Sequence, residues 1–191
     1  IGPHEVYLEH MKQVQTLLLN EDCFLPSRTR QISEVCRHAS LFGADDTIRN
    51  GQDRAHEIYH TQGSEAACQI PAGEEIRYRF PETLLSCVHL VFDSDLNRST
   101  LPVSECERYH SMRACQRLDS PQLCMPKTLC REFLLLGERG GKREELLHVT
   151  DNRKRCWHLN LNKAFDGLVL IPISGWGEND RIPVISFDFE G

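Results

Sequence analysis

The nine cysteines and nine histidines of this chain are the side chains that could act as nucleophiles, bases or metal ligands. Cys36–His38 and Cys156–His158 are each two residues apart, a spacing that places both side chains on one face of a strand. Cysteine is most often a buried core residue. We therefore interpret each pair as a core thiol beside a surface imidazole. A Cys/His dyad for nucleophilic catalysis is the alternative.

A second group of possible ligands lies in residues 99–130, a segment without a clean hydrophobic period. Structural zinc sites use cysteine and histidine, usually in knuckles with about two to four residues between paired ligands. Only Cys106 and His110 have that spacing. The sequence thus disfavours a zinc site here, although the ligand types suffice for one. The candidates are Cys106, His110, Cys115, Cys124 and Cys130.

Polar and aromatic side chains that could bind a carbohydrate-like ligand gather in three expected loops, 49–60, 95–98 and 174–180. Carboxylates and guanidinium groups hydrogen-bond to sugar hydroxyls, and Trp or Tyr rings stack on sugar C–H faces. The simpler interpretation of Asn50-Gly51 is a tight turn. The candidate ligand-binding residues are Asp53, Arg54, Tyr59, His60, Asn97, Arg98 and Trp176.

Alternating hydrophobicity predicts the strands that must position these loops. Ile76, Tyr78 and Phe80 alternate with arginines, as expected for a strand with one wet face. Positions 88, 90 and 92 repeat the pattern. Further strands are predicted at 133–136, 145–149, 156–161, 168–173 and 184–189, and turn sequences separate them at 81–83, 140–141, 151–152 and 166–167. Many short strands without interleaved helices predict an all-β antiparallel β-sandwich.

The first residues predict a different element, an amphipathic helix over 4–20. Its apolar stripe consists of Tyr7, Met11, Val14 and Leu18. Because such a stripe must be buried, and the chain starts without a methionine, we expect an excised fragment. Residues 1–25 are then a connector helix from a missing N-terminal part. Residues 26–191 form the sandwich, with an irregular excursion at 99–130.

Composition excludes several functional classes. The formal net charge of −6 argues against nucleic acid as a partner. No apolar run is long enough for a membrane helix, and no signal peptide is visible. An odd number of cysteines without an export signal indicates reduced thiols and a cytoplasmic location.

Several segments, in order, resemble a discoidin-like (coagulation-factor type C) domain of the galactose-binding superfamily. The form they resemble is the one at the C-terminus of bacterial FAD-dependent oxidoreductases. FDSDLNR at 92–98 is the most specific run. Tyr59 stands where the family usually has Trp. The resemblance therefore supports an aromatic ring for stacking on a sugar less strongly than it supports the fold. The segments are VQTLLLNEDCFLP (14–26), ISEVCRHASLFG (32–43), DDTIRNG (45–51), IRYRFPETLLSCVHLVFDSDLNR (76–98), HVTDNRKRCWHLNL (148–161) and LVLIPISGWGENDRIPVISFDFEG (168–191).

This resemblance implies a non-catalytic accessory module that binds a carbohydrate-like ligand or docks onto the missing catalytic domain of the same protein. FAD would belong to that missing part, since the chain has no G-x-G-x-x-G fingerprint and needs no cofactor of its own. The resemblance also implies a structural calcium at Asn50, Asp53 and Glu190. Two alternatives stay open: an independent cysteine- or metal-dependent hydrolase on a jelly roll, and a purely structural interaction domain.

Overall fold

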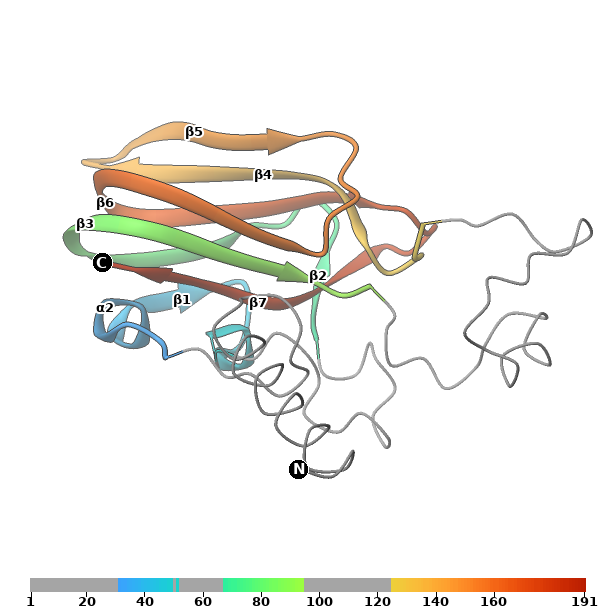
Figure 1. Cartoon of the computed structure of the whole chain (residues 1–191), viewed down its shortest axis with the longest axis horizontal. Coiled ribbons are helices and arrows are strands. Elements are labelled where there is room, and N and C mark those ends of the chain that lie inside the picture. Colours follow the sequence, from blue (N-terminus) through green and yellow to red (C-terminus); the bar gives the residue numbers. More distant parts are fainter. Residues whose placement is uncertain (1–30, 50, 52–66, 95–124) are drawn as a thin grey trace, which may run out of the picture.

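The computed structural model describes residues 31–49, 51, 67–94 and 125–191. The predicted connector helix therefore lies outside the described residues, as does most of the excursion. The helices of the described part are α2 (Glu34–His38) and the 3-10 helix η1 (Asp46–Arg49); none is long and apolar enough to cross a membrane. The strands are β1 (Ser40–Phe42), β2 (Cys68–Pro71), β3 (Ile76–Phe92), β4 (Cys130–Arg139), β5 (Lys142–Val149), β6 (Cys156–Gly175) and β7 (Arg181–Glu190) (Figure 1).

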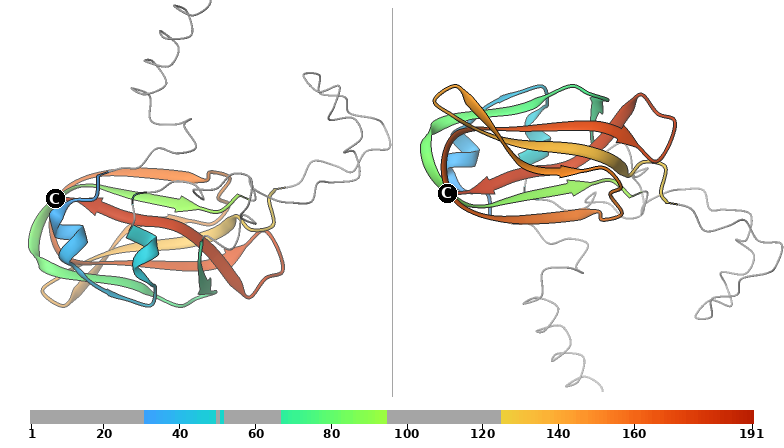
Figure 2. Two further views of the ribbon diagram at one scale, coloured as in Figure 1. Left: turned by 90° about the horizontal axis from the view of Figure 1, so that it is seen from below. Right: turned by 90° about the horizontal axis from the view of Figure 1, so that it is seen from above.

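All strand pairs are antiparallel, in the order β2-β7-β3-β6-β4-β5, with β1 on β3. The two longest strands, β3 and β6, each belong to both layers. The first part of β3 pairs with β1, and its later part pairs with β7; β6 runs alongside throughout. The sheet thus folds over on itself into a sandwich (Figure 2). The prediction of an all-β antiparallel sandwich is confirmed.

The bends of β3 and β6 correct two predicted turns. Residues 81–83 and 166–167 lie within continuous strands, at a place where the pairing register shifts between Arg79 and Thr83. Pro81 is exposed there, and a Cβ on Gly167 would lie 2.9 Å from the Tyr78 carbonyl oxygen. Proline and glycine mark bulges as well as turns, so the sequence signal for both is the same.

The core between the layers is built on aromatic side chains. Tyr78 contacts Phe187 and Phe189, each with ring centroids 5.2 Å apart, and Phe80 lies 4.6 Å from Phe189. Phe133 links this core to Phe92 and to Trp157 nearer the surface, at 5.0 and 5.6 Å. The predicted alternation is confirmed over 76–80, where residues 76, 78 and 80 are buried and 77 and 79 are not. Residues 88, 90 and 92 are buried as well, but so is the intervening Val91, so this part of β3 is covered on both faces.

Helix α2 corrects the interpretation of Cys36 and His38 as neighbours on one strand face. Ser33 caps the start of the helix by accepting a hydrogen bond from the Cys36 N–H at 3.2 Å. At the other end, Arg49 Nη1 donates to the carbonyl oxygens of Cys36 and Ala39. The Ser33 hydroxyl also donates to Phe189 O at 2.6 Å, which ties α2 to the edge of β7. Cys36 is fully buried and His38 exposed. A helix of five residues is too short to show a hydrophobic period.

The described thiols differ strongly in exposure, and this predicts their reactivity. Burial raises the pKa of Cys36 to about 11 and that of Cys130 to about 12, whereas Cys156 is exposed. Because the thiolate is the reactive form, we expect native-state alkylation at neutral pH to modify Cys156 at least about tenfold faster than Cys36 or Cys130. Peptide mass mapping over time measures the three rates, and full labelling in denaturant is the control. Equal rates in the native protein would contradict the burial of these thiols.

Candidate functional site

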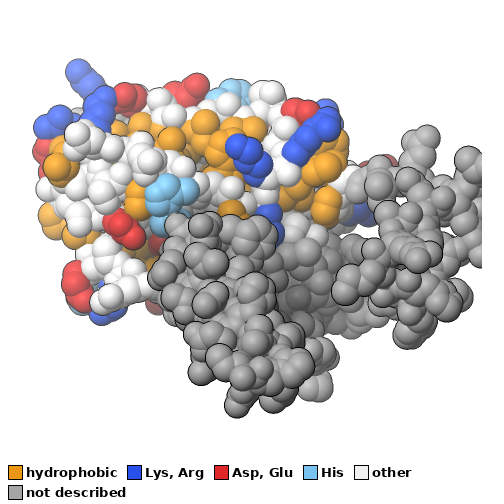
Figure 3. All heavy atoms as spheres, viewed as in Figure 1, with side chains coloured by type: hydrophobic (Ala, Val, Ile, Leu, Met, Phe, Trp, Pro, Cys, Tyr) orange, Lys and Arg blue, Asp and Glu red, His pale blue; other side chains and the backbone are white. Residues whose placement is uncertain are grey.

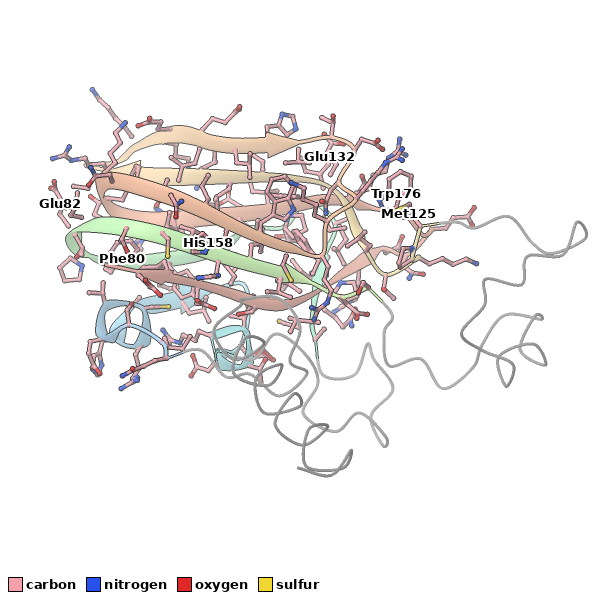
Figure 4. The ribbon with its side chains drawn as sticks, in the orientation of Figure 1. Phe80, Glu82, Met125, Glu132, His158 and Trp176 are labelled. Carbon is pink, nitrogen blue, oxygen red and sulfur yellow. The ribbon has the colours of Figure 1, made fainter. Side chains whose placement is uncertain are left out.

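Two loops meet at one end of the sandwich and form a candidate ligand site. Residues 125–129 precede β4 and residues 176–180 connect β6 to β7. Backbone hydrogen bonds join them, from Trp176 N to Leu129 O at 3.0 Å and from Gly177 N to Lys127 O at 2.9 Å. Glycine is required at 177, because a Cβ there would lie 2.6 Å from that Lys127 oxygen. Trp176 and Met125 mark this end in Figure 4, opposite the bend at Phe80 and Glu82.

Beside these loops lies an open cleft of about 740 Å³. Its floor is fixed by the pairing of β2 with β7 and by the Ala72 N–H, which donates to Asp180 O at 2.9 Å. The cleft is lined mostly by polar side chains from three separate segments: Gln69, Thr128, Glu178, Asn179, Asp180 and Arg181.

The cleft side chains supply both donors and acceptors of hydrogen bonds. Glu178 and Asp180 accept, Arg181 donates, and the two amides do both. The Thr128 Oγ1 atom is buried and has no hydrogen-bond partner within the described part of the chain. Because this oxygen has almost no exposed surface, a ligand in the cleft would reach the exposed side chains at 178–181 and not the Thr128 hydroxyl. Aromatic rings are absent from the described lining, so hydrogen bonds would dominate recognition.

Trp176 lies beside the cleft, but its ring is engaged elsewhere. The indole is half-buried, and its Nε1 donates to Asn152 O at 2.7 Å. The guanidinium carbons of Arg131 and Arg153 lie 5.0 and 5.9 Å from its ring centroid. Both are cation–π pairs. The contact with Arg153, together with the indole hydrogen bond, joins the loop after β5 to Trp176, and the contact with Arg131 joins Trp176 to β4. A role for Trp176 as a sugar platform stays a prediction.

The other predicted site residues are not brought together in the described part. Asn50, Asp53, Arg54, Tyr59, His60, Asn97 and Arg98 lie outside the described residues. Glu190, predicted as a calcium ligand, is exposed at the end of β7, where it pairs in register with Cys87. Of the excursion cysteines, Cys130 is described, and it is buried at the start of β4. Calcium and zinc binding by the predicted residues stay predictions.

Sequence reasoning selected the loop 174–180 but missed most of the cleft. It chose Trp176 for its aromatic ring, whereas residues 178–181 face the cleft. The charged run Glu178–Arg181 was a signal that could have been used. Gln69 and Thr128 come from distant segments, and their approach depends on the pairing of β2 with β7 and on the loop contacts. Nothing local in the sequence marks them.

A second cluster lies on the outer face of β3 and β6. Candidate ligand atoms of Cys87, His89 and His158 are all within 4.8 Å of one another, and His158 Nδ1 lies 3.0 Å from His89 Nε2. His158 lies on the broad face midway along the sandwich, where Figure 3 shows exposed histidine side chains. His158 is exposed as predicted. The interpretation of Cys156 as a core thiol is wrong, because Cys156 is exposed on the outer face of its strand.

The described thiol within this cluster is poorly suited to nucleophilic attack. Burial, and then the neighbouring Glu190 carboxylate, raise the pKa of Cys87 to about 11. A catalytic cysteine needs the opposite shift, because only the thiolate attacks.

Comparison with known proteins places the chain near carbohydrate-binding modules of family 32 among solved structures. No protein-family model and no curated protein sequence matches it. A module of a family 31 glycoside hydrolase bound to GalNAc is 9% identical, with a TM-score of 0.48 over 81% of this chain and 99% of that one. The module of Streptococcus pneumoniae EndoD is 8% identical, with a TM-score of 0.47 over 82% and 97%. The module of C. perfringens NanJ with galactose is 7% identical, with a TM-score of 0.41 over 79% and 90%. These likenesses are remote, so the fold class rests on the strand pairing itself.

Proposed function

We propose that this chain is a non-catalytic accessory module that binds a neutral, hydroxyl-rich ligand of the carbohydrate type in the cleft at 178–181. The observation that carries the proposal is the composition of the cleft. Two carboxylates, two amides and a guanidinium line it, from the loop and strand residues 178–181 and from Gln69 on β2. A sugar hydroxyl can both donate and accept a hydrogen bond. A lining that offers both acceptors and donors can therefore satisfy both capacities of each hydroxyl.

The charge of the cleft favours a neutral ligand over an anion. Two carboxylates stand beside one guanidinium, Arg181, and its Nη1 already donates to the Gln69 carbonyl at 3.4 Å. A phosphate or sulfate would meet repulsion from Glu178 and Asp180. Hydroxyl groups would accept from Arg181 and donate to the carboxylates without that cost.

Two substitutions test the cleft. Asn179→Ala and Asp180→Ala each remove a side chain that can bind a hydroxyl directly. We expect at least about tenfold weaker binding from Asp180→Ala, since a hydrogen bond to a charged group contributes about 1.5–3 kcal/mol. We expect about two- to tenfold weaker binding from Asn179→Ala, because a hydrogen bond between neutral groups contributes about 0.5–1.5 kcal/mol. Glycan-array screening of the wild type finds the ligand, and calorimetry compares the variants. Glu144→Ala on β5 is the matched control, because Glu144 is exposed and remote from the cleft lining. A glycan that binds wild type and both variants equally would place the site elsewhere.

The parent protein of the module stays a prediction from the family resemblance. An FAD-dependent catalytic part would carry a strand, a G-x-G-x-x-G turn and a helix, and a cytoplasmic location would keep the cysteines reduced. Sequencing the adjoining reading frame tests the first point. Docking of residues 4–20 onto that part concerns residues outside the described structure.

The hydrolase alternative finds no support in Cys36, Cys87 or Cys130. Cys36 and Cys130 are buried with raised pKa values, and Cys87 combines the same shift with a position on a broad sheet face. A hydrolase places its nucleophile in the substrate cleft. The cleft at 178–181 is lined by no cysteine or histidine among the described residues.

A further inference from the structure

The structure assigns a binding site for a Zn²⁺-class transition-metal ion to Cys87, His89 and His158, on the outer face of β3 and β6. The site is separate from the ligand cleft, and it does not depend on the proposed function. It also differs from the predicted calcium residues and from the excursion cysteines. Three observations carry it: the placement of the ligands, their separations, and the charge around them.

Strand pairing places the three ligands on one face. Cys87 and His89 are two residues apart on β3, so their side chains point the same way. His158 of β6 is the direct register partner of His89. Directly opposed residues of antiparallel strands have Cβ atoms roughly 4.5–5.5 Å apart. The sheet therefore holds the cluster without help from loops.

The separations fit a tetrahedral ion after small side-chain rotations. Zinc–nitrogen and zinc–sulfur bonds of about 2.0 and 2.3 Å place two ligand atoms roughly 3.3–3.6 Å apart. The imidazole nitrogens of His89 and His158 lie 3.0 Å apart, and the Cys87 Sγ completes a triangle within 4.8 Å. Three protein ligands leave a fourth position for water, and the exposure of His158 gives an ion access from solvent.

Negative charge surrounds the cluster on the neighbouring strand. In register, Asp188 of β7 lies opposite His89, and Glu190 lies opposite Cys87. Asp188 is buried and accepts a hydrogen bond from the Ser186 hydroxyl at 2.7 Å. Carboxylates next to the ligands favour a cation electrostatically. Thiolate and imidazole together select zinc or its first-row neighbours over calcium or magnesium.

Cobalt titration of the metal-stripped, reduced 191-residue chain tests the site. A thiolate ligand gives Co²⁺ a near-ultraviolet charge-transfer band, and Zn²⁺ should displace the Co²⁺ and remove that band. We expect His158→Asn to weaken this binding at least about tenfold, and Cys87→Ser to remove its charge-transfer contribution. His148→Asn and Cys156→Ser are the matched controls, since both side chains are exposed and neither belongs to the cluster.

Thermal unfolding gives a second reading that needs no spectroscopic band. Zn²⁺ that binds only the folded protein raises its melting temperature, and this rise should be lost in His158→Asn and kept in His148→Asn. His158 is exposed, so its replacement leaves the core intact even if Cys87→Ser folds poorly. Absence of Co²⁺ binding by the wild type would overturn the proposal. An unchanged affinity in His158→Asn, or a full band in folded Cys87→Ser, would do the same.

Discussion

Phe187→Ala is expected to lower the free energy of unfolding by about 3–5 kcal/mol. Phe187 is fully buried on β7, and its ring packs on Tyr78 at 5.2 Å. The Tyr78 hydroxyl donates to the Phe187 carbonyl at 2.8 Å, so the side chain sits where the two layers are joined. Removal of the ring leaves a cavity that the paired strands cannot close. Urea unfolding followed by the fluorescence of Trp157 and Trp176 measures the loss.

Phe42→Ala is the matched control for this substitution. Phe42 is 52% exposed on β1, and the same change of side chain should cost less than about 1 kcal/mol there. A loss from Phe187→Ala no larger than that of the control would contradict the placement of β7 inside the sandwich.

Glu138→Gln is expected to have the second large effect and to lower the free energy of unfolding by about 2–3 kcal/mol. The Glu138 side chain on β4 is only 8% exposed, and its two oxygens accept from Arg77 Nε and Arg143 Nε, each at 2.8 Å. Loss of its charge leaves both arginines without their buried partner. The cost stays below that of a fully buried pair because both arginines keep contact with water. Thermal and urea unfolding at neutral pH measure it.

An exposed ion pair on the neighbouring strands supplies the control. Glu144 of β5 binds Lys163 Nζ at 2.6 Å, and both side chains are 50% exposed. Glu144→Gln should therefore change stability by less than about 1 kcal/mol. Similar losses from both glutamates would show that burial of Glu138 contributes nothing.

The sheet could be predicted from the sequence because its core residues alternate. Ile76, Tyr78 and Phe80 face inward while Arg77 and Arg79 do not, and that period of two is local information. The continuity of β6 through Asp166 and Gly167 could not be predicted, since the same residues favour a turn when no partner strand is known. Pairing with β3 on one side and β4 on the other keeps that segment extended.

The sites could be predicted only in part, for the same reason. The sequence names loop 174–180 as a candidate, but Thr128 joins the lining of the cleft through contacts between distant segments. The sequence pairs Cys156 with His158 because the two residues are two positions apart. Cys87 instead lies beside that imidazole, because register and not sequence spacing decides which side chains meet across a sheet.

Ligand binding at the end of the sandwich is tested most directly by a heteronuclear NMR titration of the chain with mono- and disaccharides. We expect shifts confined to the backbone amides of Gln69, Thr128 and residues 178–181, because these groups line the cleft. The amides of the opposite end, near Phe80 and Glu82, should not move. A saccharide panel that shifts no amide of the cleft, or a saccharide that binds at another face, would contradict the proposed function.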